Sequence, residues 1–502
     1  MKNLYVLILG ALLLFLVACS SGNSEQESSD TGSSENKISM ETSKSEGKRS
    51  RPAPPNGEDY DDMFFEDYGT NPFVSTEDDT LSTFAMDVDT GSYSVTRNYI
   101  KRGELPPDEA VRVEEFVNYF GSNLQAPAND TFAIGVDGGK SPFGEGYHLL
   151  RISMKGKEIK VEDRKNANLT FVIDVSGSMN HENRLGLVKK SLRMLVDELQ
   201  PQDKVGIVTY GSQGRVVLQP TSIDKKDRII HAIEELQPEG STNAEEGLTL
   251  GYGLAREYFT EGSINRVVLA SDGVANVGKT GHKEILNEIK EYAQEDITLS
   301  TLGFGMGNYN DVLMEQLANN GDGNYAYIDS FSEARRVFME QLTGTLQTIA
   351  KDAKIQVEFD PKKVDRYRLL GFENRDVKDE DFKDNSVDGG EVGAGHSVTA
   401  LYEVKLNEST NDLGKISLRF FSEEKQEVEE MQKTLSFSED DNPSKNLMFL
   451  ASVAEFAEIM GESYWAKESS LESVLELAQS SAQNEEQFAF VELVKDAIAI
   501  KP

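Results

Sequence analysis

The chain has 502 residues, which leaves room for several domains and a sizeable hydrophobic core. It contains 87 acidic and 51 basic residues, so its formal net charge is -36. Because binding to phosphate groups needs clustered Lys and Arg side chains, this charge argues against nucleic acid or an anionic lipid surface as a partner.

Residues 1–18 have the pattern of an export signal. Lys2 supplies a positive start, and the apolar segment 4–17 is short for a permanent transmembrane helix. Leu16-Val17-Ala18-Cys19 resembles the bacterial lipobox, and the resemblance implies cleavage before Cys19 and lipidation of its sulfur. An ordinary secretory signal is the alternative. We therefore expect a lipid-anchored protein at the extracytoplasmic face of the cell membrane.

Residues 19–62 are rich in Ser, Glu, Gly, Asn and Lys and lack apolar periodicity, which predicts a disordered tether. A small N-terminal module, 63–126, follows. Its segment 82–94 predicts a strand, a turn and a helix over 93–101, and a second helix is expected from 108 to 119. Asp87-Val88-Asp89-Thr90-Gly91 invites a calcium-loop interpretation, but the later glutamate of an EF-hand is missing.

Residues 165–350 alternate strands and helices, which predicts an α/β fold with a mostly parallel, doubly wound sheet. Polar side chains stand where two of the buried strands end. Asp174, Ser176 and Ser178 follow the strand 169–173, and Asp272 follows the strand 267–271. The carboxyl ends of strands are where open α/β sheets bind ligands. An Asp/Ser cap of the next helix is the plainer interpretation.

Asp-x-Ser-x-Ser at 174–178, Gly-Ser-Thr-Asn at 240–243 and Ser-Asp-Gly at 271–273 resemble, in order and spacing, the metal-ion-dependent adhesion site of a von Willebrand factor type A (VWA) domain. The resemblance implies a divalent metal, with Mg²⁺ favoured over Mn²⁺ or Ca²⁺. The residues that it implies as ligands are Asp174, Ser176, Ser178, Thr242 and Asp272. Such a set suits Mg²⁺ and leaves room for an outside oxygen, such as an Asp or Glu carboxylate of a protein partner.

Two further stretches, 82–94 and 112–120, resemble the N-terminal module of the YfbK-like group of bacterial VWA lipoproteins. This resemblance extends over most of the mature chain. It implies a Rossmann-like VWA domain with an N-terminal α+β module.

Strands are also predicted on both sides of the VWA region. Two, at 132–136 and 149–154, precede it, and four follow it, at 354–359, 367–372, 398–406 and 415–421. We expect one β-sandwich, 127–160 and 353–440, interrupted by the VWA domain; separate modules in series are the alternative. Residues 376–396 are acidic and Gly-rich, which predicts a surface loop. Helical spacing over 441–502 predicts packed C-terminal helices.

Gly273 to Thr280 matches the Walker A pattern, which would indicate a P-loop NTPase. The loop follows a middle strand of the domain, and export would take the protein to where ATP is scarce. No G-x-S-x-G, HExxH or CxxC pattern is present, and the five histidines are scattered. We therefore expect a binding module and not an enzyme. An envelope scaffold, in which the metal mainly stabilises the fold, is the other interpretation.

Overall fold

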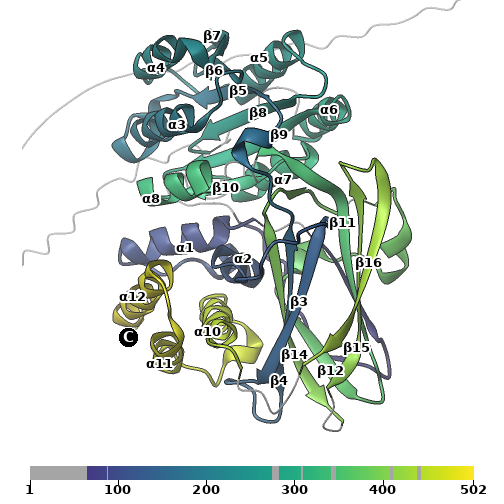
Figure 1. Ribbon diagram of the computed structural model, residues 1–502. Helices are drawn as coiled ribbons and strands as arrows, with labels where there is room; N and C mark the ends of the chain where they lie inside the picture. The colour runs from purple at the N-terminus through teal and green to yellow at the C-terminus, as the bar shows by residue number, and fades with distance from the viewer. Residues whose placement is uncertain are drawn as a thin grey trace, which may run out of the picture. The chain divides into compact units, whose positions relative to one another are not determined.

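The computed structural model describes residues 65–501 apart from 87–88, 274–281, 307–308, 341–345, 388, 408–410 and 438–442. The described residues form a six-stranded sheet with helices on both faces, two five-stranded sheets and a group of C-terminal helices (Figure 1). Within the same residues, no helix has the length and apolar composition needed to cross a bilayer.

The six-stranded sheet has the order β10-β9-β8-β5-β6-β7 and is parallel except for β7, which runs antiparallel to β6. Its strands are β5 (Ala167–Asp174), β6 (Lys204–Tyr210), β7 (Gly214–Ser222), β8 (Ile264–Ser271), β9 (Ile297–Phe304) and β10 (Tyr325–Ile328). Along β5, Phe171 belongs to one core cluster and Val172 to the other, so both faces are buried. This arrangement confirms the predicted fold class.

Helices α3 (Leu187–Glu198), α4 (Lys226–Glu234) and α8 (Phe331–Arg335) pack on one face of this sheet. Helices α5 (Ala244–Glu257), α6 (His282–Gln294) and α7 (Asp311–Asn320) pack on the other. A glycine on α5 sets how closely that helix lies to β5, because a β-carbon at Gly251 would overlap the Val172 side chain.

We expect Gly251→Ala to lower the free energy of unfolding by about 1–3 kcal/mol, because the added methyl group overpacks the α5–β5 contact. Gly253→Ala is the matched control. Gly253 lies on the same helix, is exposed and has no heavy atom near its would-be β-carbon. Alanine there should raise helix stability by up to about 1 kcal/mol. Urea unfolding of both variants tests this, and equal shifts in the same direction would contradict the packing argument.

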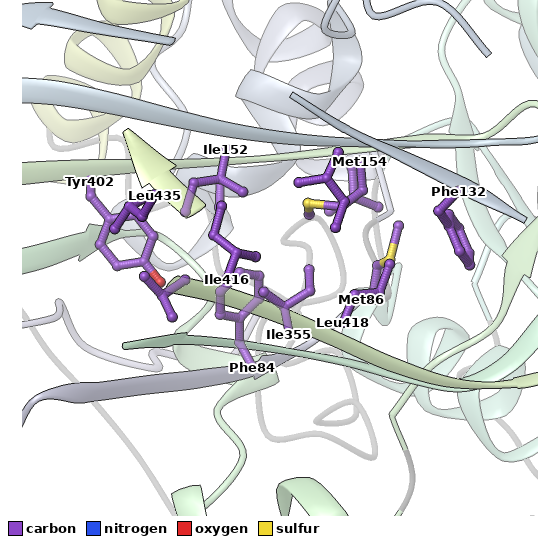
Figure 2. Packing of buried hydrophobic residues seen from close by; sticks show 14 of the residues in the cluster. Phe84, Met86, Phe132, Ile152, Met154, Ile355, Tyr402, Ile416, Leu418 and Leu435 are labelled. Atoms are coloured by element: carbon purple, nitrogen blue, oxygen red, sulfur yellow. The ribbon is translucent and has the colours of Figure 1, made fainter. Parts of the chain in front are cut away.

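The other two sheets lie face to face as a β-sandwich. One contains β1 (Val74–Ser75), β12 (Val364–Leu370), β14 (Ser397–Leu406), β4 (His148–Gly156) and β3 (Phe132–Lys140). The other contains β13 (Val392–Gly393), β11 (Thr348–Phe359), β15 (Asp412–Ser422), β16 (Glu427–Ser436) and β2 (Leu81–Ala85). Figure 2 shows Ile152 and Met154 of one sheet facing Ile355 and Leu418 of the other. Strand β4 precedes the six-stranded sheet in the chain, and its partner β14 follows it.

Two local predictions are wrong. The helix expected over 108–119 is broken into a 3-10 turn, Asp108–Ala110, and α2 (Val113–Tyr119). Arg112, between them, has an extended backbone that cannot continue a helix, and its buried guanidinium pairs with Glu115 and Asp311. The segment 376–396 is more than a surface loop, since Phe382 is buried and β13 pairs with β11.

The remaining helices share a third core with the outer face of the sheet that holds β4, β12 and β14. They are α1 (Gly91–Lys101), α2, α10 (Lys445–Met460), α11 (Leu471–Ser481) and α12 (Glu485–Ile500). Tyr93, Phe116, Phe449 and Phe490 lie together in this core. Apolar packing thus joins the N-terminal helices to the C-terminal ones.

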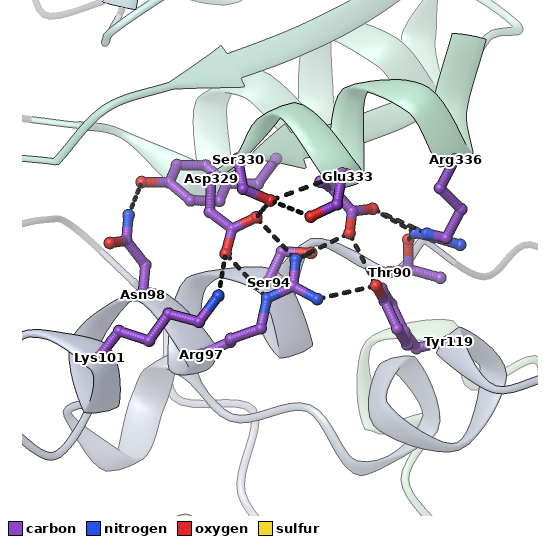
Figure 3. A network of polar contacts seen from close by, with 12 residues as sticks. Thr90, Ser94, Arg97, Asn98, Lys101, Tyr119, Asp329, Ser330, Glu333 and Arg336 are labelled. Atoms are coloured by element: carbon purple, nitrogen blue, oxygen red, sulfur yellow. Dashed lines mark hydrogen bonds and ion pairs between the residues drawn. The ribbon is translucent and has the colours of Figure 1, made fainter. Parts of the chain in front are cut away.

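Buried charges join α1 and α2 to the segment that contains α8 (Figure 3). We name this network the α1–α8 junction. Arg97 donates to Asp329 at 2.6 Å and to Glu333 at 2.8 Å, and the Tyr119 hydroxyl donates to Glu333 at 2.8 Å. Arg336 donates to the other oxygen of Glu333 at 2.6 Å. Glu333 therefore accepts from two guanidinium groups and a phenol, and it connects the six-stranded sheet to the N-terminal helices.

Candidate metal centre

The two aspartates of the predicted metal site lie at one edge of the six-stranded sheet. Asp174 ends β5, and Asp272 directly follows β8. These strands are parallel neighbours, with Ile173 opposite Ala270. Both carboxylates are buried, with relative exposures of 0% for Asp174 and 7% for Asp272. The sheet register therefore brings together two acids that are far apart in the sequence.

Ser176 and Ser178 connect these carboxylates. The backbone N–H of Ser176 donates to Asp174 Oδ1 at 2.8 Å, and the Ser176 and Ser178 Oγ atoms are 2.9 Å apart. Ser178 Oγ donates to Asp272 Oδ1 at 3.1 Å. The second oxygen of Asp174 accepts from Ser271 Oγ at 2.9 Å. Four of the five predicted ligands thus form one connected set of oxygens.

The fifth predicted ligand, Thr242, is half-buried just before α5. Its loop is bonded to the serine loop, because Gly177 N–H donates to the carbonyl of Gly240 at 3.1 Å. Gly240 has a φ of +67°, and a β-carbon there would overlap Ser212, so glycine is needed at this turn. The backbone therefore holds the loop of Thr242 beside the serines.

The electrostatics of the centre favour a cation. Burial raises the pKa of Asp174 to about 7, and the negative charge of Asp272 adds to the rise. Burial also raises the pKa of Asp272, although Arg184 opposes the shift. The raised pKa values mean that nearby positive charge does not fully compensate the burial of the two carboxylates. A cation bound between them would remove that cost.

Arg184, which the sequence analysis did not single out, already supplies part of the missing charge. It lies in a π-helical turn, Glu182–Gly186, and its Nη1 donates to Asp272 Oδ2 at 2.6 Å and to the Ser178 carbonyl at 2.7 Å. Its Nη2 donates to the carbonyl of Met306. An arginine near a helix start suggests a solvated side chain, so no signal in the sequence alone pointed to this contact.

The donor set fits a hard cation. Its atoms are carboxylate and hydroxyl oxygens, and Mg²⁺ prefers oxygen ligands and takes only one or two carboxylates from a protein. Within the described ranges, no group of three or more His, Cys, Asp or Glu side chains is placed to bind a metal. A zinc-type cluster is therefore absent from that part of the chain.

Three other sites were considered from the sequence: the lipidation site, the Walker A match and the calcium loop. Cys19 and residues 274–280 of the Walker A match lie outside the described residues. Of the proposed calcium loop, Asp87 and Val88 also lie outside them. Asp89 is buried and accepts from the backbone of Tyr325 and from Arg375. Asp89 thus has a structural role at the contact between the N-terminal module and β10.

The sequence matches three family descriptions. Residues 168–342 match the von Willebrand factor type A domain, and 59–151 match a family described as von Willebrand factor. Residues 344–412 and 404–500 match "Uncharacterized protein YfbK, C-terminal". The chain is 36% identical over 460 residues to the YfbK protein of Escherichia coli, covering 86% of this chain and 80% of that protein. The chain belongs to the YfbK-type VWA protein family.

More distant likenesses involve parts of other proteins. Human inter-alpha-trypsin inhibitor heavy chain H4 is 24% identical over 309 residues, which is 59% of this chain and 31% of that protein. A solved von Willebrand factor type A structure from Catenulispora acidiphila is 15% identical, covers 74% of this chain and 92% of its own, and has a TM-score of 0.44. In this YfbK-type chain the VWA match includes all five candidate ligands of the metal centre.

Proposed function

We propose that this YfbK-type protein is an extracytoplasmic binding module that binds a protein partner through a divalent cation in its VWA domain. One observation carries the proposal. Two buried carboxylates from neighbouring parallel strands, Asp174 and Asp272, are connected through two serines: the Ser176 N–H donates to Asp174, and the Ser178 hydroxyl, which contacts that of Ser176, donates to Asp272. Such a set has the oxygen chemistry and the charge that Mg²⁺ needs.

Asp174, Ser176, Ser178, Thr242 and Asp272 would hold the cation. When bound, it would supply Lewis-acid attraction for one more oxygen from outside the chain. The chain's own contacts orient the ligands: Ser271 holds one oxygen of Asp174, and the Ser176 N–H holds the other. A carboxylate of Asp or Glu in a partner protein is the oxygen donor that such a centre favours.

The proposal includes anchoring by lipid at Cys19, which follows the lipobox pattern Leu16-Val17-Ala18. We expect Cys19→Ser to release the protein from the membrane or to leave an uncleaved precursor, because two or more acyl chains give the stable attachment. Fractionation and the mass of the mature N-terminus measure this. Cleaved Cys19→Ser protein that is still fully retained at the membrane would contradict lipid anchoring.

The binding role is tested by cross-linked capture of envelope proteins with the chain, in Mg²⁺ and in chelator. We expect partners that are captured in Mg²⁺ and lost both in chelator and with Asp174→Ala. A scaffold role predicts a different result: Mg²⁺ would raise the melting temperature, while the captured proteins would be the same with and without metal. That outcome would replace the adhesion role with a stabilising one.

A further inference from the structure

We propose that Arg184 determines the ligand specificity of the metal centre. Its fixed positive charge weakens cation binding but leaves the loaded centre with a net positive charge, which selects an anionic carboxylate over a neutral oxygen donor. The inference rests on the proposed function and assigns a role to a residue that lies outside the five predicted ligands.

The contacts of Arg184 place its charge within the centre. Nη1 donates to Asp272 Oδ2 at 2.6 Å, whereas Ser178 Oγ donates to the other oxygen, Oδ1, at 3.1 Å. Arg184 therefore binds one oxygen of Asp272 and leaves the other bonded to Ser178. The Arg184 side chain is 17% exposed and that of Asp272 is 5% exposed. A ligand that approaches from solvent can reach the guanidinium more readily than the carboxylate.

The loop after β9 holds the Arg184 side chain in position. Gly305 has a φ of +77°, and a β-carbon there would overlap the Arg184 side chain from Cγ to Nε. The Gly305 carbonyl accepts from the Tyr327 hydroxyl, which in turn accepts from Asn98 Nδ2 at 3.1 Å. The loop after β9 is thus held by β10 and α1, and it provides both the space for the side chain and the Met306 carbonyl that binds it.

The net charge of the centre depends on Arg184 and on whether a cation is bound. When both aspartates are ionised they contribute two negative charges and Arg184 contributes one positive charge, so the centre without its cation is then singly negative. A divalent cation makes it singly positive, whereas without Arg184 the loaded centre would be neutral. A unit charge a few ångströms away changes binding strongly in a partly buried site. The same side chain therefore lowers the affinity for the cation and raises the affinity for a carboxylate.

The test uses the full chain in detergent, with Mn²⁺ as the metal probe and acetate as the carboxylate probe. The variants are Arg184→Gln, Arg184→Lys and Arg193→Gln. Arg193 is the matched control, because it lies on α3, is half exposed and pairs with Glu234 at the surface. Free Mn²⁺ measured by electron paramagnetic resonance gives the metal affinity. Water-proton relaxation of the Mn²⁺-loaded protein reports displacement of bound water by acetate.

We expect Arg184→Gln to bind Mn²⁺ about tenfold more tightly and to need about tenfold more acetate for the same displacement. Its melting temperature without metal should fall, because no positive charge then offsets the repulsion between Asp174 and Asp272. Arg184→Lys should stay near the wild type in both binding assays since the charge is kept, and Arg193→Gln should change neither.

Unchanged or weaker Mn²⁺ binding by Arg184→Gln, or an unchanged acetate response, would overturn the inference while leaving the metal site intact. If that variant does not fold, Arg184→Lys decides: loss of the acetate response with the charge retained would contradict a role for charge. Absence of Mn²⁺ binding by both the wild type and Arg193→Gln would overturn the proposed function, and this inference with it.

Discussion

Asp174→Ala should lose Mg²⁺ binding by more than about a hundredfold, since loss of a direct ligand should exceed the roughly 10–100-fold effect of outer-shell partners. The substitution removes one of two charged ligands and leaves mainly neutral hydroxyls. Mg²⁺ gives up water reluctantly, so the remaining carboxylate of Asp272, which already pairs with Arg184, and a set of neutral hydroxyls should hold it only weakly. Isothermal calorimetry with Mg²⁺ on the wild type and the variant measures the effect.

Ser176→Ala and Thr242→Ala provide graded controls, because each removes one neutral ligand and should weaken binding less than Asp174→Ala. The fold should survive all three changes. Asp174→Ala should melt no lower than the wild type without metal, because it removes a buried carboxyl whose pKa is raised to about 7 by burial and by Asp272. Equal Mg²⁺ affinity in the wild type and Asp174→Ala would exclude the adhesion-site assignment.

Glu333→Gln should be strongly destabilising, by about 3–5 kcal/mol, because it leaves buried guanidinium groups without their counter-charge. Glu333 is 2% exposed and accepts from Arg97, Arg336 and the Tyr119 hydroxyl. Thermal melting at pH 7 measures the effect. Glu234→Gln is the control, since the Glu234–Arg193 pair is half exposed, and its loss should cost less than about 1 kcal/mol.

The effect of Glu333→Gln should depend on pH. Burial acts to raise the pKa of Glu333, but Arg336 and Arg97 outweigh it and hold that pKa below its ordinary value. A lowered folded-state pKa means that the stabilisation is fully present above the unfolded value of about 4.3 and is lost as the pH falls through the folded value. The gap in melting temperature should therefore be widest near neutral pH and narrow in acid. A gap that is constant with pH would contradict this account.

The fold and most of the centre could be predicted because their causes are local in the sequence. Buried strands such as β5 and β8 show as continuous apolar runs, and a polar residue directly after each run marks the carboxyl edge of the sheet. Since parallel neighbours end at one edge, Asp174 and Asp272 could be expected together. The loop of Thr242 followed only from the family resemblance.

The features that could not be predicted depend on contacts between distant segments. Arg184 contacts Asp272 and Met306, which lie 88 and 122 positions further along the chain, so only the folded protein brings them together. The α1–α8 junction joins residues more than 200 positions apart, and a single charged residue such as Glu333 does not reveal its partners. The sequence does not predict strand β16, because most of its residues are exposed and it lacks the alternation that marks a half-buried strand.

The most direct test of the metal centre is a crystal of the protein soaked in Mn²⁺, with anomalous scattering used to locate the metal. We expect one strong peak in direct contact with oxygens of Asp174, Ser176, Ser178, Thr242 and Asp272. No peak at the carboxyl edge of β5 and β8, or a metal held by other residues, would contradict it.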